Sequence, residues 1–244
     1  MQIEGKNAVL EALRAGTAID KLLIERGAER GGIGGTIFRQ AREKGIPVTF
    51  APREALDRQS LTGRHQGFLA LSPDFSYASA EEILALARER GEDPFVVLLD
   101  GVEDPHNLGS VIRVCECAGV HGLIIPEHRS AKVNETVMRV SAGACNHLKI
   151  ARAVNLAAEL DALKEAGLWT AWLEADGEPI WGTDLGGPLA LVVGGEGKGI
   201  RPLVRRHCDR VVSIPMRGKV NSLNASVACG VAVFEVLRRR TGGN

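Results

Sequence analysis

The decisive stretch of this chain of 244 residues is IPMRGKVNSLNASVACG, from Ile214 to Gly230. It follows a short apolar run, crosses a loop that contains proline and glycine, and enters a helix that we expect to continue to Arg240. Ser222 and Asn224 stand at the expected helix start, where a side-chain oxygen can accept hydrogen bonds from unpaired backbone N–H groups. The helix body consists of small residues, so a second backbone could approach it closely.

Two interpretations fit this stretch. A well-capped core helix would account for the two polar residues at its start. The loop argues for more, because glycine flanked by Arg217 and Lys219 leaves its backbone open, and three polar side chains precede an otherwise apolar helix. We therefore expect a ligand site here.

The longer segment IPMRGKVNSLNASVACGVAVFE resembles the third signature motif of the SPOUT superfamily of RNA methyltransferases, in the TrmH branch that methylates the ribose 2′-hydroxyl. The resemblance implies an α/β fold whose C-terminal parallel-sheet domain binds S-adenosylmethionine in a deep trefoil knot. Composition and periodicity do not indicate a knot, and knots are rare among proteins.

A second polar loop follows the apolar run from Phe95 to Leu99, which is typical of a buried parallel strand. Asn107 is well placed here to cap a helix from 107 to 118, and Gly109 would admit a close neighbour. Arg113 lies within that apolar helix, where a charge needs a partner; an ion pair with Glu116 or Asp104 is one reading. The spacing Asn-x-Gly-x-x-x-Arg also matches the family's first motif, which favours a site residue.

A third loop, Val193 to Ile200, places four glycines around Glu196 after another apolar run. Glycines in such a loop indicate backbone packed against a ligand. The pattern fails both the dinucleotide fingerprint and the phosphate-binding loop, because Lys198 is followed by Gly199 rather than by serine or threonine. It resembles the family's second motif.

Taken with the resemblance, the three loops imply a set of site residues. The residues that match the family's catalytic positions are Asn107, Arg113, Glu196, Ser222 and Asn224. The expected cofactor-binding residues are Gly194, Gly195, Ile214, Met216 and Leu223. We favour Arg113 as an electrostatic stabiliser over a general base, because a guanidinium is hard to deprotonate.

The first part of the chain alternates short helices and strands, with GGIGG at 31–35 as a flexible turn. The segments EGKNAVLEAL and GRHQGFLAL resemble the RNA substrate-binding domain of ribose-methylating family members. We therefore divide the chain into a substrate-binding domain at 1–72, a linker at 73–91 and a methyltransferase domain at 92–244. RNA contacts are expected from Arg64 and His65 in the first domain, or these residues only complete a turn, and from Arg217 and Lys219 in the last.

Composition limits the remaining classes. A net charge of zero gives no overall basic field, although residues 1–72 carry 11 Lys and Arg against 8 Asp and Glu. The start of the chain does not read as a signal peptide, and no apolar run is long enough for a membrane helix, so we expect a cytoplasmic protein. The 5 cysteines fit reduced thiols, and Cys115 and Cys117 point apart on one helix, so we expect no metal.

The sequence therefore predicts an S-adenosylmethionine-dependent methyltransferase of the ribose 2′-hydroxyl. By resemblance its substrate is a guanosine in 23S rRNA and its assembly a homodimer. A tRNA substrate and a non-catalytic RNA-binding member of the same fold remain as alternatives. A nucleotide-dependent enzyme of doubly wound fold is disfavoured by the failed fingerprints.

Overall fold

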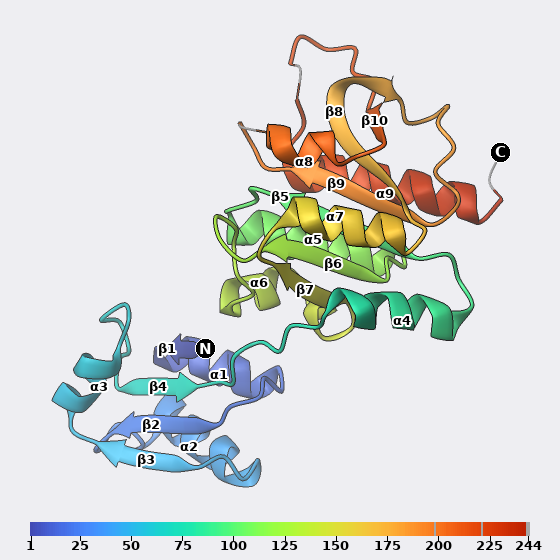
Figure 1. Ribbon diagram of the computed structural model, residues 1–244. Coiled ribbons are helices and arrows are strands. Elements are labelled where there is room, and N and C mark those ends of the chain that lie inside the picture. Colours follow the sequence, from blue (N-terminus) through green and yellow to red (C-terminus); the bar gives the residue numbers. More distant parts are fainter. Residues whose placement is uncertain (198, 221, 243–244) are drawn as a thin grey trace. The chain divides into compact units, whose positions relative to one another are not determined.

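The computed structural model describes residues 1–197, 199–220 and 222–242, which form two compact units, Met1–Phe75 and Ser76–Asn244 (Figure 1). The division lies close to the expected boundary at residue 72. The segment 73–91, expected as a linker, contains helix α4 (Ala80–Arg90), which belongs to the second unit. Ile83 of α4 is fully buried, and a side chain at Gly122 would lie 2.4 Å from it. Most of the expected linker is therefore part of the second core.

The first unit is a four-stranded sheet of order β1-β4-β2-β3. Its elements are β1 (Gln2–Glu4), α1 (Lys6–Arg14), β2 (Lys21–Glu25), α2 (Gly32–Glu43), β3 (Val48–Ala51), α3 (Arg53–Gln59) and β4 (Phe68–Leu71). Strands β2 and β3 are parallel, and the other pairs are antiparallel. Strand β1 was not expected from the sequence.

Alternation along the strands divides the side chains of this sheet between two faces. Leu22 and Ile24 pack in one cluster with residues of α1 and α2, whereas Leu23, between them, packs with Leu56 of α3. Helix α2 begins at Gly32, so the segment 31–35 is helical over most of its length. The prediction of a flexible turn there was wrong. Gly34 is needed there for close packing, because a Cβ atom on it would lie 1.9 Å from the carbonyl oxygen of Ala28.

The second unit is a parallel sheet of six strands in the order β10-β8-β9-β5-β6-β7. These strands are β5 (Phe95–Asp100), β6 (Gly122–Pro126), β7 (Lys149–Ala153), β8 (Trp169–Pro179), β9 (Leu189–Gly194) and β10 (Arg210–Ser213). The connecting helices are α5 (Pro105–Cys117), α6 (Glu135–Val140), η1 (Ala144–Asn146), α7 (Leu156–Glu165), α8 (Pro202–Arg206) and α9 (Ala225–Arg240). Strand β7 was not expected.

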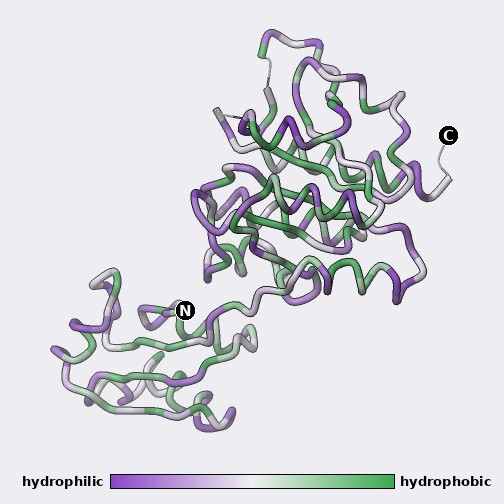
Figure 2. Tube along the Cα trace, viewed as in Figure 1, coloured by the Kyte–Doolittle hydropathy of each residue, from purple (hydrophilic) through white to green (hydrophobic). Residues whose placement is uncertain are grey.

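Helices cover both faces of this sheet, which explains why its central strands are mostly apolar (Figures 1 and 2). Side chains of α4, α7 and α8 pack with Val96, Leu98 and Val192 in one cluster. Helices α5 and α9 pack against each other on the other face, where the Sγ atoms of Cys115 and Cys229 lie 4.0 Å apart. The α/β fold with a parallel C-terminal sheet is confirmed. The knot stays a prediction.

Strand order decides where a ligand can bind. After β5 the chain moves outward to β6 and β7, then crosses to β8 and returns to β9, which lies directly beside β5. The carboxyl ends of β5 and β9 therefore meet at a switch point, where open α/β sheets hold their ligands. No helix of the described residues is long and apolar enough to cross a membrane.

Candidate active site

Three loops that are far apart in the sequence meet at the carboxyl ends of β5, β9 and β10. Asn107 from the first, Glu196 from the second and Asn224 from the third form one hydrogen-bonded cluster. Asn224 Nδ2 donates to Asn107 Oδ1 at 2.9 Å and also to Glu196 Oε1, and Asn107 Nδ2 donates to the same carboxylate oxygen at 3.2 Å. Three of the expected catalytic residues are thus in direct contact.

Asn224 uses both ends of its amide. Its Oδ1 accepts hydrogen bonds from the backbone N–H groups of Ser226 at 2.9 Å and Val227 at 3.3 Å, so it caps α9. Its Nδ2 is left free to donate to the cluster. The expectation that a polar residue caps this helix is confirmed for Asn224, and the same side chain also joins the site.

Asn107 does not cap α5, so that prediction was wrong. The cap is Asp104, whose Oδ1 accepts a hydrogen bond from the backbone N–H of His106 at 2.9 Å. Pro105 occupies the first helical position, where its missing N–H and fixed φ are tolerated. Asn107 then lies in the first turn, and its amide is free to reach the cluster.

The loop after β9 is held against the loop after β5. The backbone N–H of Gly195 donates to the carbonyl of Asp100 at 2.8 Å, and a Cβ atom at Gly195 would lie 2.0 Å from the carbonyl oxygen of Gly101. The buried carboxylate of Asp100 accepts from the backbone N–H of Arg201 at 2.8 Å and from its Nε at 2.7 Å. Glycine is therefore required at 195 by the neighbouring backbone, and Asp100 anchors the far end of the loop.

A cavity of about 160 Å³ opens beside the cluster. Its lining includes all of the expected cofactor-binding residues, namely Gly194, Gly195, Ile214, Met216 and Leu223. Glu196 and Ser222 also line it, and Ala225 and Ala228 contribute the small surface of α9. The lining also holds Leu173, Glu174 and Ala175 of β8, which the sequence analysis did not single out. The sequence feature that could have indicated these residues is their position at the end of an apolar strand.

Arg113 is the expected catalytic residue that lies neither in the cluster nor on the cavity lining. It lies about 9 Å further along α5 than Asn107 and about 120° around the helix axis, from ideal helix geometry. Its side chain is exposed and does not line the cavity. Among the residues that the structure describes, it forms no ion pair with Glu116 or Asp104, so that reading finds no support.

Gly109 does admit a close neighbour, and that neighbour is α6. A Cβ atom on Gly109 would lie 2.7 Å from Cβ of Val140.

Within the described ranges, no group of three or more His, Cys, Asp or Glu side chains could hold a metal ion. A hydrogen bond with Cys229 and burial raise the pKa of the Cys115 thiol, so this cysteine is a core residue.

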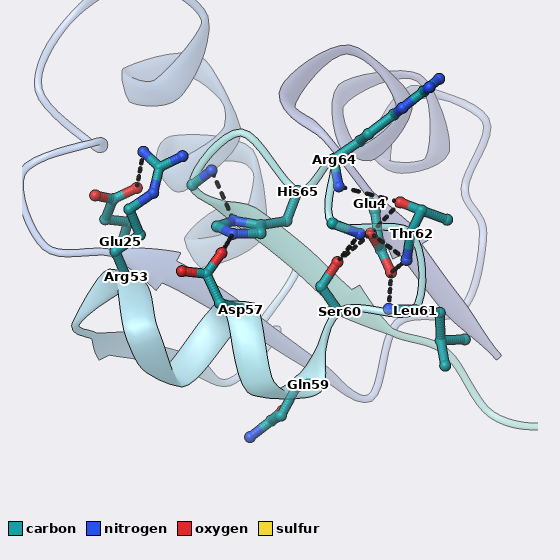
Figure 3. A network of polar contacts seen from close by, with 12 residues as sticks. Glu4, Glu25, Arg53, Asp57, Gln59, Ser60, Leu61, Thr62, Arg64 and His65 are labelled. Atoms are coloured by element: carbon teal, nitrogen blue, oxygen red, sulfur yellow. Dashed lines mark hydrogen bonds and ion pairs between the residues drawn. The ribbon is translucent and has the colours of Figure 1, made fainter.

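In the first unit, two anchors hold the loop between α3 and β4 (Figure 3). The carboxylate of Glu4 accepts hydrogen bonds from Ser60 Oγ and the backbone N–H of Leu61, both at 2.6 Å, and from the hydroxyl of Thr62. Burial raises the pKa of Glu4, but these hydrogen bonds outweigh it and lower the pKa below its ordinary value. The loop is thereby tied to the end of β1.

The second anchor is His65, and here the expected RNA contact is corrected. His65 is 1% exposed, its Nδ1 accepts a hydrogen bond from the backbone N–H of Gly67 at 3.0 Å, and its Nε2 lies 2.9 Å from Asp57 Oδ1. Since Nδ1 is an acceptor, the ring proton is on Nε2 and is donated to Asp57. Arg64 is exposed and its side chain points away from this network (Figure 3). Arg217 and Lys219 are also exposed.

Comparison with known proteins agrees with this geometry. Residues 94–234 match the SpoU rRNA Methylase family, and residues 2–78 match a domain described as RNA 2′-O ribose methyltransferase substrate binding. The chain belongs to the SpoU rRNA methylase family. This membership makes it an RNA methyltransferase and confirms the family part of the resemblance.

Two of the relatives described here cover nearly the whole chain, and a third covers about two thirds of it. A putative TrmH family tRNA/rRNA methyltransferase of Bacillus subtilis, YacO, is 41% identical over 97% of this chain and 94% of its own length. Among solved structures, the SpoU methyltransferase AviRb of Streptomyces viridochromogenes, in complex with AdoMet, aligns with a TM-score of 0.70 and 25% identity, covering 100% of this chain and 91% of that one. The TrmH/SpoU tRNA modifying enzyme of A. aeolicus aligns with a TM-score of 0.57 and 28% identity, covering 65% of this chain and 83% of that one.

Proposed function

We propose that this protein transfers a methyl group from S-adenosylmethionine to the ribose 2′-hydroxyl of an RNA nucleotide. The observation that carries the proposal is the cluster of Asn107, Glu196 and Asn224 at the mouth of a cavity lined by all the expected cofactor-binding residues. The same site in a non-catalytic protein would have no need of an ordered polar cluster beside the cavity.

The cavity lining fits the proposed donor. Leu173, Ile214 and Leu223 offer apolar surface for an adenine ring, and Gly194 and Gly195 bring backbone groups within reach of its polar edge. Bound S-adenosylmethionine would supply an already activated methyl group on a sulfonium cation, so the protein has only to align the acceptor, exclude water and handle one proton.

Each residue of the cluster then has a distinct role. Asn107 and Asn224 both donate to one oxygen of Glu196, which fixes the direction of its carboxylate. The second carboxylate oxygen can accept a hydrogen bond from the 2′-hydroxyl and hold it toward the methyl group. Ser222 is proposed to orient the ribose, which its exposed position at the cavity supports. Arg113 stabilises the negative charge that develops on the 2′-oxygen or an adjacent phosphate.

Arg113 can take this role only if a second copy of the chain supplies it. The protein is therefore proposed to act as a homodimer in which Arg113 of one chain faces the cluster of the other. The exposed side chain of Arg113 supports this, as do the exposed apolar side chains of Val227 and Phe234 on α9, which are 51% and 47% exposed. These two residues lie seven apart, so they share one face of the helix.

Mixing two variants of strongly reduced activity tests the arrangement. Arg113→Ala and Asn224→Ala chains are denatured together and refolded as a mixture. If Arg113 acts across the dimer, each mixed dimer has one intact site, and random pairing restores about one quarter of the wild-type activity. If both residues act within one chain, every site lacks one of them, and the mixture stays as inactive as its components.

The RNA is proposed to contact Arg217 and Lys219 beside the cavity and Arg64 in the first unit, with 1–72 as the substrate-binding part. His65 positions the loop that carries Arg64 and does not itself touch RNA. The proposed target is a guanosine of 23S rRNA, and its place of action is the cytoplasm. A tRNA nucleotide is the second candidate, because the A. aeolicus structure is described as a tRNA modifying enzyme.

The test is mapping of 2′-O-methyl groups in rRNA and tRNA from cells with and without the protein, followed by methyl transfer to each RNA in vitro. Loss of one 2′-O-methylguanosine in 23S rRNA and its restoration by the purified protein is the expected result. Loss at a tRNA position instead would replace the target. Calorimetric titration with S-adenosylmethionine that shows no binding would contradict catalysis altogether.

A further inference from the structure

Glu174 is an acidic residue of the cavity that neither the motifs nor the polar cluster account for. Strand β8 pairs with β9 only from Trp169 to Trp172 and then leaves that ladder. Its pairing with β10 shifts register beyond Trp172 and resumes at Glu178. Between these points, Leu173, Glu174 and Ala175 line the cavity. Besides Glu196, which is engaged in the polar cluster, Glu174 is the acidic side chain of this lining.

The surroundings of Glu174 leave it able to accept hydrogen bonds from a ligand. Its side chain is 27% exposed, and its Oε2 lies 2.6 Å from Nη2 of Arg205 in an ion pair. This oxygen is shielded from solvent and its charge is compensated by the guanidinium, so it is not open to a ligand. The other oxygen, Oε1, is not among the shielded atoms and has no partner within the described residues, so it can accept hydrogen bonds from a ligand.

Arg205 fixes the position of this carboxylate. Its Nε donates to the carbonyl of Ile200 at 2.8 Å, so the same guanidinium holds the end of the loop after β9 and the carboxylate on β8. A Cβ atom at Gly199 would lie 3.4 Å from Nη2 of Arg205, which shows how closely the guanidinium packs on this loop. Glu174 is therefore held at the cavity wall, and its side chain is already ordered before a ligand binds.

The charge of Arg205 selects the kind of group that Glu174 can bind. S-adenosylmethionine has two positively charged groups, the sulfonium and the ammonium, and it has neutral donors in the two ribose hydroxyls. A second cation beside the guanidinium would meet like-charge repulsion, whereas a neutral hydroxyl would not. The oxygen that Arg205 does not hold has two lone pairs, so it can accept from both vicinal hydroxyls.

We propose that Glu174 binds the methyl donor by accepting hydrogen bonds from the 2′- and 3′-hydroxyls of its ribose, which rests on the function proposed above. The competing explanation is that the pair of Glu174 and Arg205 only braces the loop after β9. In that case Glu174 would affect the binding of every ligand of the cavity equally, whether or not the ligand has hydroxyl groups.

A cycle of two proteins and two ligands separates these explanations. Titration calorimetry measures the affinity of 5′-methylthioadenosine and its 2′,3′-dideoxy analogue for the wild-type chain and for Glu174→Ala. Hydrogen bonds to a charged acceptor contribute roughly 1.5–3 kcal/mol, so removing the hydroxyls should weaken binding to the wild type by about tenfold to a hundredfold. The same change should make little difference to Glu174→Ala. Equal losses for both ligands would overturn the proposal.

Further measurements make the result specific. Glu178→Ala changes another glutamate of β8 that does not line the cavity, and it should bind both ligands as the wild type does. S-adenosylhomocysteine keeps the amino-acid part of the donor, and its affinity should fall by the same factor as that of 5′-methylthioadenosine when Glu174 is replaced by alanine. A loss of affinity confined to S-adenosylhomocysteine would assign the contact to the ammonium group and refute the ribose assignment. If Glu174→Ala does not fold, Glu174→Gln should show a smaller dependence on the hydroxyls than the wild type. A wild-type chain that binds neither S-adenosylmethionine nor its analogues would defeat the proposed function itself.

Discussion

Replacing Asn224 by serine and by alanine separates its two tasks. Both variants remove the amide nitrogen that donates to Asn107 and Glu196, but serine keeps an oxygen that can accept from the backbone N–H of Ser226. Serine and asparagine are about equally good caps, whereas alanine cannot cap a helix. The structure thus predicts that both variants lose activity and that only alanine loses stability.

The magnitudes follow from the contacts. Loss of the cap costs about 1 kcal/mol, which corresponds to a fall in Tm of roughly 2–4 °C for a folding unit of this size. Loss of the donated hydrogen bonds, one of them to a carboxylate, removes about 1.5–3 kcal/mol from the orientation of Glu196 and should slow methyl transfer about tenfold to a hundredfold.

The assays are thermal unfolding followed by circular dichroism and single-turnover transfer of a labelled methyl group to RNA. Asn155→Ala is the matched control, because Asn155 caps α7 by accepting from the backbone N–H of Ala157 at 3.0 Å and does not line the cavity. It should lose similar stability without losing the rate of the chemical step. The reasoning would be refuted if Asn224→Ser kept full activity, or if it lost as much stability as Asn224→Ala.

Three further predictions concern the anchors and the RNA surface. Glu4→Gln should speed amide hydrogen exchange in the loop 60–62. Because the pKa of Glu4 is lowered in the folded state, the contribution of Glu4 to stability is lost as the pH falls through that pKa. Exchange in the loop that stays equally slow at acid pH would contradict this. Removing Arg217 or Lys219 should weaken RNA binding and flatten its dependence on salt, measured by filter binding, whereas the same slope as the wild type would exclude a phosphate contact. Asp100→Ala should lower the free energy of unfolding by about 2 kcal/mol in urea and weaken binding of the methyl donor, because it frees the end of the loop after β9; full donor affinity would show that this anchor does not shape the cavity.

Much of the fold could be predicted from local patterns. The uninterrupted apolar run before Asp100 indicates a strand covered on both faces, and β5 is such a strand. A polar residue before a run of small apolar ones indicates a capped helix, and Asn224 caps α9. The residues expected to bind the cofactor line one cavity, because they lie in glycine-rich loops that follow parallel strands, where such folds place ligands.

Other features depend on neighbours that are distant in the sequence. His65 looks like an exposed loop residue until Asp57 and the backbone of Gly67 are seen to satisfy both of its nitrogens. The glycines near residue 34 look like a turn, but one of them allows a helix to pack against a carbonyl group. Asn107 looks like a helix cap until Asp104 is found in that place.

The sequence by itself determined which loops carry the polar chemistry, because glycine, asparagine and capping residues constrain the backbone within a few positions of themselves. Only the tertiary structure decided that these loops meet, that Glu174 faces the same cavity, and that Arg113 of the same chain does not join the cluster. The physical reason is that strand order and helix packing set the distances between residues that are about a hundred positions apart in the chain, and no local preference encodes those distances.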